Sequence, residues 1–259
     1  MTEHTAGRGR PFSWSGLLRE YLAHSEITIL LAIAIVAGGT WAFIGIAGEV
    51  LEGDTHAFDE RLLLALRNNP NDLGDPIGPP WFEEIMRDYT ALGGVGVLSI
   101  LTLGVIGYLL LAQKRQTALF VLVTIVGGML VSLLLKGGFS RPRPDLVPYG
   151  SVVLTSSFPS GHSMLSASTY LTLGALLTRL QPNRRLKIYI LAVAVLLTML
   201  VGVSRVYLGV HWPTDVAAGW TAGAVWAALC WLVARWLQHR GAIEREAHDD
   251  KQPEHAPVA

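Results

Sequence analysis

Residues 117–135 read TALFVLVTIVGGMLVSLLL and are followed directly by the polar stretch KGGFSRPRP at 136–144. An α-helix needs about 20 apolar residues to cross the hydrocarbon core of a bilayer, so the first stretch is long enough to span one. The second stretch places one lysine and two arginines where that helix would leave the membrane. The pair predicts a membrane helix that ends in concentrated positive charge.

Five further apolar runs accompany this one, at residues 27–47, 91–112, 162–180, 188–203 and 215–237. The chain of 259 residues is 51% hydrophobic and only 15% charged, whereas soluble domains are about 25% charged. This composition argues against a soluble enzyme with a single core. We predict an all-α fold, a six-transmembrane-helix bundle over 27–237, preceded by a cytoplasmic segment at 1–26 and followed by a disordered cytoplasmic tail at 238–259.

The distribution of lysine and arginine predicts which way the bundle points, because short loops that carry them tend to stay in the cytoplasm. With six spans both termini share a side, and that side would carry thirteen of the twenty basic residues. These are Arg8, Arg10, Arg19, Lys114, Arg115, Arg179, Arg184, Arg185, Lys187, Arg235, Arg240, Arg245 and Lys251. We therefore predict cytoplasmic termini and an outer, periplasmic loop at 48–90.

The outer loop contains a patterned segment of its own. Over residues 57–67 (AFDERLLLALR) apolar and charged side chains recur at helical spacing, which predicts a periplasmic helix lying in the membrane interface. Two roles remain open for it. An amphipathic spacer is favoured over a lid or an entry route for a substrate.

Three polar clusters follow, at residues 136–144, 159–162 and 204–215. The predicted topology brings all three to the outer face, at the ends of different helices. Ionisable groups at the edge of the hydrocarbon core are energetically costly, so their gathering on one face indicates a functional site.

The cationic members of these clusters are suited to bind a phosphate. Lys136, Arg143 and Arg205 supply fixed positive charge, and an arginine can hold two oxygens at once. Ser160 and Gly161 open a predicted helix, where Ser160 is a natural N-cap and Gly161 lets the backbone approach a bound anion.

Two histidines complete the predicted site. Asp215 follows His211 by four residues, so one helical turn would bring its carboxylate to one ring nitrogen and leave the other nitrogen free to attack. His162 comes from another helix and has no carboxylate beside it in the sequence, which suits a proton donor for a leaving alkoxide. We predict His211 as the nucleophile, Asp215 as its orienting group and His162 as the acid.

The three clusters together resemble the three-part signature of the type-2 phosphatidic acid phosphatases, also called lipid phosphate phosphatases. The matching residues are Lys136-x6-Arg143-Pro144, Pro159-Ser160-Gly161-His162 and Ser204-Arg205-x5-His211-x3-Asp215. The resemblance implies a six-helix membrane phosphatase that works through a phosphohistidine on His211, without a metal or other cofactor. It also implies that the phosphoryl oxygens are held by Lys136, Arg143, Ser160, Gly161 and Arg205.

The function expected on these grounds is that of a bacterial inner-membrane phosphatase with its site on the periplasmic face. Its partners would be a lipid phosphate substrate and the surrounding membrane lipids. Undecaprenyl pyrophosphate, phosphatidylglycerol phosphate and phosphatidic acid all remain open as substrates, with Arg141 a candidate extra cation for a pyrophosphate. Twenty basic and twenty acidic residues balance, which gives no support to a nucleic-acid partner. The oligomeric state is left open.

Other functions compete with this one. A lipid phosphotransferase would use the same phosphohistidine and pass the group to a second lipid. Vanadium haloperoxidases resemble the same signature, but six membrane spans are not expected of them. An anion transporter or a non-catalytic lipid-binding protein would use the cations without chemistry at His211.

Overall fold

The computed structural model describes residues 14–69, 72–144 and 156–240. Over these residues the chain folds into eight helices and one short hairpin: α1 (Trp14–Glu52), α2 (His56–Leu64), β1 (Arg67–Asn69), β2 (Asp72–Pro76), α3 (Pro80–Leu92), α4 (Val95–Leu111), α5 (Arg115–Gly137), α6 (Gly161–Arg179), α7 (Arg184–Tyr207) and α8 (Pro213–His239). The predicted N-terminal segment is helical from Trp14 onward, as the start of α1. The tail predicted to be disordered over 238–259 begins later than expected, because α8 continues to His239. Residues 1–13 and 241–259 lie outside the described residues.

Each apolar run of the sequence lies in helix, but the run at 91–112 does not form one continuous helix. It is divided between the end of α3 and the whole of α4, whose axes differ by 49°. The break falls at Gly93 and Gly94, where the junction lies tightly against its neighbours. A Cβ on Gly93 would lie 2.4 Å from Cγ1 of Val201 and 3.2 Å from the carbonyl oxygen of His162. The bend therefore lets the α3–α4 junction approach both α7 and the start of α6.

Four helices, α1, α5, α7 and α8, are long and apolar enough to cross a membrane, or five spans if the bent pair α3–α4 counts as one. The described part of α6 is not among them. Its sequence contains three serines and three threonines in 19 residues. A helix enclosed by other helices faces little lipid, so it can carry such side chains. The chain is thus a mostly helical membrane protein, and a full count of six spans remains a prediction.

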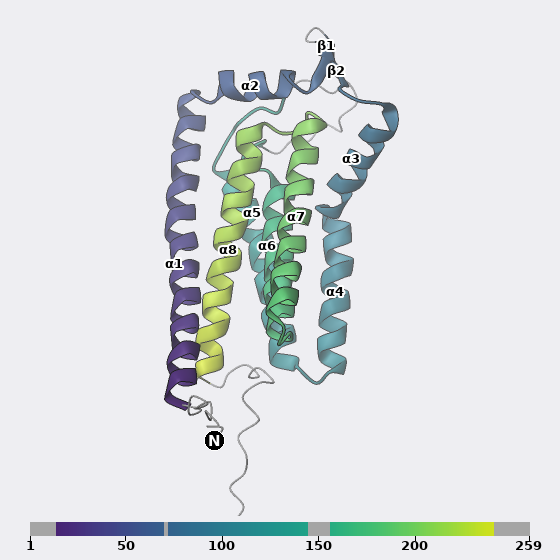
Figure 1. Cartoon of the computed structure of the whole chain (residues 1–259). Helices are drawn as coiled ribbons and strands as arrows, with labels where there is room; N and C mark the ends of the chain where they lie inside the picture. The colour runs from purple at the N-terminus through teal and green to yellow at the C-terminus, as the bar shows by residue number, and fades with distance from the viewer. Residues whose placement is uncertain (1–13, 70–71, 145–155, 241–259) are drawn as a thin grey trace, which may run out of the picture.

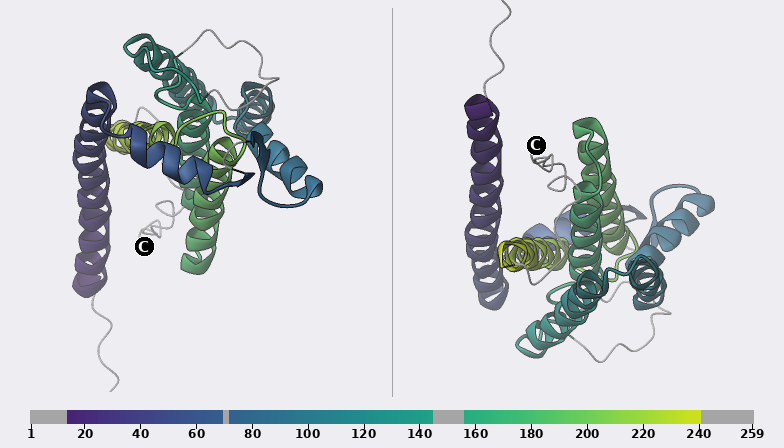
Figure 2. Two further views of the ribbon diagram at one scale, coloured as in Figure 1. Left: turned by 90° about the horizontal axis from the view of Figure 1, so that it is seen from above. Right: turned by 90° about the horizontal axis from the view of Figure 1, so that it is seen from below.

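The arrangement of the helices places α6 at the centre of the bundle, against α5, α7 and α8, with α1 outside α8 (Figures 1 and 2). The contact of α6 with α8 is close because α8 presents two glycines to it. A Cβ on Gly219 would lie 2.6 Å from the carbonyl oxygen of Ser160, and one on Gly223 would lie 2.5 Å from Cβ of Ala167. Small residues at this spacing let two membrane helices pack backbone to backbone.

Two tryptophans of α8 fix it to the helices on either side. The indole N–H of Trp220 donates to the carbonyl oxygen of Thr198 on α7 at 3.0 Å. That of Trp226 donates to the carbonyl oxygen of Thr124 on α5 at 2.9 Å. Because an unpaired indole N–H is costly in an apolar interior, these bonds restrict how α8 can rotate.

The first loop covers one end of the bundle, opposite the end where α1 begins and α8 finishes (Figure 1). The helix predicted within 57–67 is present as α2 and lies across that end, while its place relative to a membrane remains a prediction. The antiparallel hairpin β1–β2 was not predicted; it pairs Arg67 with Pro76. A guanidinium N–H of Arg67 donates to the carbonyl oxygen of Tyr207 at 2.9 Å, and the Tyr207 hydroxyl donates to the carbonyl oxygen of Ile77 at 2.6 Å. These bonds tie the hairpin region to the end of α7.

Candidate active site

The three polar clusters of the sequence meet at the end of the bundle that α2 covers (Figure 1). Each predicted residue lies at or beside a helix end: Lys136 in the last turn of α5, Arg143 beyond it, Ser160 as the N-cap of α6, Gly161 and His162 in its first turn, Arg205 in the last turn of α7, His211 between α7 and α8, and Asp215 in the first turn of α8. Segments far apart in the chain thereby contribute to one site.

His211 is nearly completely buried, with 1% of its surface exposed. Its Nδ1 lies 3.4 Å from Oδ2 of Asp215 and 3.3 Å from Oγ of Ser157. Its Nε2 lies 3.2 Å from a terminal guanidinium nitrogen of Arg143. Since a guanidinium can only donate hydrogen bonds, Nε2 is the acceptor in this contact. The proton of the neutral ring therefore sits on Nδ1, and Nε2 carries the lone pair.

The surroundings of His211 also keep it uncharged. Its pKa is lowered from 6.5 to about 4, chiefly by burial; the hydrogen bond to Asp215 acts in the opposite direction, and the nearby charge of Arg205 acts in the same direction as burial. At neutral pH the imidazole is therefore a free base. A neutral imidazole whose second nitrogen is held by a carboxylate is the arrangement that nucleophilic catalysis requires.

Asp215 is held from several sides and has no exposed surface. Arg141 donates to Oδ1 at 2.6 Å, and the backbone N–H of Trp212 donates to Oδ2 at 3.0 Å. The Ser157 hydroxyl donates to the same Oδ2 that faces His211. A buried carboxylate with this many donors is fixed in position and stabilised as the anion.

Arg143 and Arg205 provide positive charge with unused donors. The Nε atoms of both side chains are buried and have no hydrogen-bond partner among the described residues. Arg143 is anchored at its end by the carbonyl oxygen of Val210, at 3.1 Å. Arg205 lies close enough for its charge to act on His162 and His211. Buried donors without partners are costly, and an anion between the two guanidinium groups would satisfy them.

The start of α6 borders the same space. The hydroxyl of Ser160 accepts from the Ser163 N–H at 3.5 Å, which confirms Ser160 as an N-cap. The next N–H groups, of Gly161 and His162, belong to the first turn, which an anion at this helix end would meet. A Cβ on Gly161 would lie 3.1 Å from Cε of Lys136. The lysine side chain therefore lies directly along this helix start, where its ammonium donates to the carbonyl oxygen of Ser156 at 3.1 Å.

His162 is half-buried and comes from α6, whereas His211 precedes α8. The charges of Arg205, Lys136 and Arg143 and the ring of His211 all act on it, so it shares their space. The geometry thus brings together all eight residues predicted for the site.

Two residues with direct contacts to this cluster, and a third that bonds to one of them, were not predicted to belong to it. Ser157 bonds Asp215 and adjoins His211, yet in the sequence it is one serine among several. Arg141, considered above as an extra cation for a pyrophosphate, instead donates to Asp215 and, at 2.6 Å, to Asp59 of α2. Two carboxylates already engage its terminal nitrogens, so it is not placed as a further anion-binding group. Asp59 was only one of several acidic residues in the first loop, and its burial could not be read from the sequence.

Comparison with known proteins identifies the family to which this chain is similar. The model of the PAP2 superfamily matches residues 117–239. Phosphatidylglycerophosphatase B of Bacillus subtilis is 36% identical over 152 residues, which cover 57% of this chain and 72% of that protein. An undecaprenyl-diphosphatase of Sulfolobus acidocaldarius is 41% identical over 68 residues, 26% of this chain and 29% of that protein.

A solved structure extends the likeness to the fold. The crystal structure of a transmembrane PAP2-type phosphatidylglycerolphosphate phosphatase from Bacillus subtilis superimposes with a TM-score of 0.69 at 28% identity. The alignment covers 79% of this chain and 98% of that one. With the signature residues gathered at one end of a like-folded bundle, the chain belongs to the PAP2 superfamily.

Proposed function

We propose that this protein hydrolyses the terminal phosphate of a lipid phosphate or pyrophosphate, with His211 as the nucleophile. One observation carries the proposal: Nε2 of a buried, neutral His211 bears its lone pair on the side of Arg143, while Nδ1 faces Asp215. That is a nucleophile with a cation beside its reactive atom. The relatives that act on phosphatidylglycerol phosphate and undecaprenyl pyrophosphate support a lipid as the substrate.

In the first step, Nε2 of His211 attacks the phosphorus and the bond from phosphorus to the lipid oxygen breaks. Arg143 turns its donor from Nε2 to a phosphoryl oxygen, and Arg205 and Lys136 neutralise the remaining charge. His162, held in its protonated form by the negative charge of the bound phosphate, gives its proton to the leaving oxygen. The products are a dephosphorylated lipid and a phosphohistidine, whose charge on Nδ1–H is balanced by Asp215.

In the second step, a water molecule attacks the phosphorus and the bond to Nε2 breaks. His162, neutral after the first step, accepts the proton of that water. Inorganic phosphate leaves and His211 returns to its starting tautomer. Both reaction steps use cationic side chains for charge neutralisation, and their independence of metal ions is part of the proposal.

The position of the site at the helix ends suits a lipid substrate. A lipid can keep its tails in the hydrocarbon and present its headgroup where α5, α6, α7 and α8 meet. We infer that the site faces the periplasm and the termini face the cytoplasm of a bacterial inner membrane, on the strength of the basic residues at the opposite end.

The test is phosphate release by the purified protein in detergent micelles. The panel is phosphatidylglycerol phosphate, undecaprenyl pyrophosphate and phosphatidic acid, with His211→Ala and His162→Ala as variants and a chelator as a separate arm. If wild type releases phosphate from one of these lipids and both variants lose that activity, the proposed phosphatase function is supported. Strong inhibition by the chelator that added divalent metal reverses would overturn the metal-independent mechanism.

Two further measurements separate the competing functions. A quench in alkali, which leaves a phosphorus–nitrogen bond intact, should trap label from a phosphate-labelled lipid on wild type and none on His211→Ala. Phosphate release without any added acceptor excludes an obligatory phosphotransferase. A transporter or lipid-binding protein would keep its function in His211→Ala, because neither role needs a nucleophile.

A further inference from the structure

The first loop contributes a buried carboxylate to the neighbourhood of the site. Asp59, on α2, has no exposed surface. Its Oδ2 accepts from Arg141 at 2.6 Å and from the Thr214 hydroxyl at 2.6 Å, and its Oδ1 accepts from the Thr214 N–H at 2.9 Å. Asp59 therefore bonds both to the arginine that holds Asp215 and to the residue that precedes Asp215 in the first turn of α8.

Arg141 connects the two carboxylates through separate nitrogens. One terminal nitrogen donates to Oδ1 of Asp215 and the other to Oδ2 of Asp59, each at 2.6 Å, and 13% of its side chain is exposed. The planar guanidinium has a fixed fork geometry, so fixing one end orients the other. Removing one member of such a buried group leaves an uncompensated charge.

The consequence for Asp215 is that its two oxygens have separate tasks. Oδ1 is held by Arg141, and this leaves Oδ2 directed at Ser157 and Nδ1 of His211. If Arg141 lost its second anchor, it would be free to turn, and Asp215 could rotate with it. The lone pair on Nε2 of His211 depends on that orientation.

We propose that Asp59 and Arg141 are positioning residues that hold Asp215, and through it His211, in the reactive arrangement. This inference rests on the proposed function. It assigns to α2 a task beyond covering the end of the bundle, since this loop helix supplies the outer anchor of the nucleophile.

The test compares Asp59→Asn and Arg141→Ala with the matched control Glu60→Gln, an exposed neighbour on the same helix. The kcat for the best lipid substrate should fall about tenfold or more in the two variants, the scale seen when the hydrogen-bond partner that orients a metal-binding side chain is removed. The KM should stay within about twofold, because neither residue is placed to touch the phosphate. Glu60→Gln should match wild type in both.

A double substitution distinguishes positioning from mere support of the fold. If Asp59 acts through Asp215, Asp59→Asn should lower kcat in the wild-type background and leave it unchanged in an Asp215→Asn background. Equal losses in both backgrounds, or an unchanged kcat in Asp59→Asn, would overturn the inference. Full activity of His211→Ala would instead overturn the proposed function, so the two failures can be told apart.

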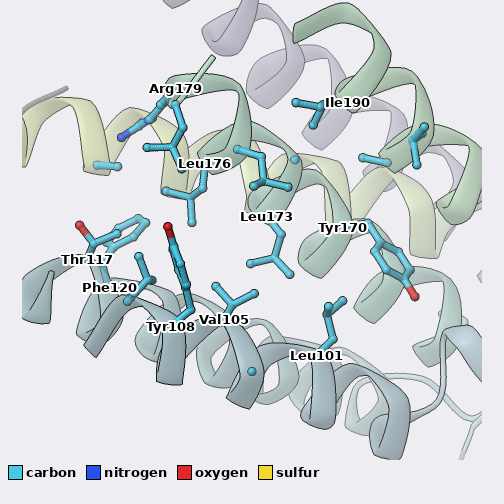
Figure 3. Close-up of a pocket in the computed structure, with 18 of the residues that line it drawn as sticks. Leu101, Val105, Tyr108, Thr117, Phe120, Tyr170, Leu173, Leu176, Arg179 and Ile190 are labelled. Atoms are coloured by element: carbon cyan, nitrogen blue, oxygen red, sulfur yellow. The ribbon is translucent and has the colours of Figure 1, made fainter. Parts of the chain in front are cut away.

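A second feature, independent of the site, lies toward the opposite end of the bundle. A crevice of about 740 Å³ opens between α4 on one side and α6 and α7 on the other, within the range of about 300–1,000 Å³ that small-molecule sites occupy. Figure 3 shows Leu101, Val105, Leu173 and Leu176 pointing into it from the two sides. Within a bilayer, such an apolar space is filled by hydrocarbon.

Polar residues join the lining where the helices end. Lys114 connects α4 to α5, Arg179 ends α6 and Gln238 lies in the last turn of α8; all three line the crevice. In Figure 3, Arg179 and Thr117 lie at one end and Tyr170 at the other. The crevice thus pairs an apolar interior with basic residues at the end away from the catalytic cluster, the combination by which membrane proteins bind anionic phospholipids.

We infer that the crevice binds one acyl chain of an anionic phospholipid from the leaflet opposite the catalytic cluster, with the phosphate beside Lys114. The occupant is a membrane lipid and not the substrate, because His211 lies at the other end of the bundle. Two glycines of α4 allow a matched test. Gly104 lines the crevice and Gly107 does not, and a Cβ on either would meet nothing within 4 Å.

The experiment is native mass spectrometry of protein released from nanodiscs of equal phosphatidylglycerol and phosphatidylcholine. Wild type and Gly107→Phe should retain one phosphatidylglycerol, Gly104→Phe should lose it, and Lys114→Gln should bind both lipids equally. Equal retention by the two phenylalanine variants would overturn the inference. So would a raised KM for the lipid substrate in Gly104→Phe alone, because the crevice would then hold the substrate's tail.

Discussion

The two ends of the helix bundle differ in how specifically their buried side chains are paired. Around His211, buried polar groups from α2, α8 and the connections between helices satisfy one another through several bonds each. Toward the other end, α4 lies apart from α6 and α7 and leaves an apolar crevice. A buried charge needs specific partners, whereas an apolar surface in a membrane needs only hydrocarbon. Substitutions should therefore have large effects at the first end and small effects at the second.

The largest effect is expected for Asp215→Asn. The amide would no longer hold the proton on Nδ1 of His211, and Arg141 would lose one of its two carboxylates. The kcat should fall by about 10³- to 10⁴-fold, the scale seen when the orienting carboxylate of a catalytic histidine is made neutral. Steady-state phosphate release measures it, with Asp54→Asn, an exposed aspartate, as control. A loss below about tenfold would mean that Asp215 does not orient the nucleophile.

Arg205→Lys should have the next largest effect. Lysine keeps the charge but loses the planar fork that grips two oxygens. We expect kcat/KM to fall by about 10²-fold, comparable to the loss of one donor to a developing anion. Arg87→Lys is the control, because the side chain of that arginine is 68% exposed and pairs with Glu83 on its own helix. Equal turnover in Arg205→Lys and wild type would show that charge alone is enough at this position.

The comparison of the two ends can be tested through stability with a pair of leucine substitutions. At Gly219 a side chain would meet the carbonyl oxygen of Ser160 at 2.6 Å, whereas at Gly107 it would meet nothing within 4 Å. Overpacking should cost Gly219→Leu about 1–3 kcal/mol or more, and Gly107→Leu should stay within about 0.5 kcal/mol of wild type. Thermal unfolding in detergent checks both. Similar melting temperatures for the two variants would mean that the α6–α8 contact adapts easily.

The same contrast explains how much could be predicted from the sequence. Helix positions could be predicted, because apolar runs mark helices. That the eight signature residues meet at one end of the bundle could also be predicted, because each lies at or beside a helix end; their roles stay a prediction. Asp59 and Arg141 were not paired, since 82 positions separate them and charge alone does not indicate a partner. The helix break at Gly93 was also missed. An apolar run indicates that side chains face lipid or protein, but it does not show whether the helix axis bends.

The smallest effect concerns pH. Burial lowers the pKa of His211 to about 4, so the nucleophile should remain a free base at pH 5.5, where a solvated imidazole with a pKa near 6.5 would be mostly charged. Between pH 7.5 and 5.5, protonation of His211 should therefore change kcat/KM only a few-fold.

The same pKa predicts how stability depends on pH. Below pH 6.5 the unfolded chain takes up a proton at His211 that the folded protein does not, so the free energy of unfolding should decline as the pH falls toward 4. Melting temperatures at pH 7 and pH 5 should differ less in His211→Gln than in wild type. If the melting temperature changed equally with pH in both proteins, a group other than His211 would be responsible for the pH dependence.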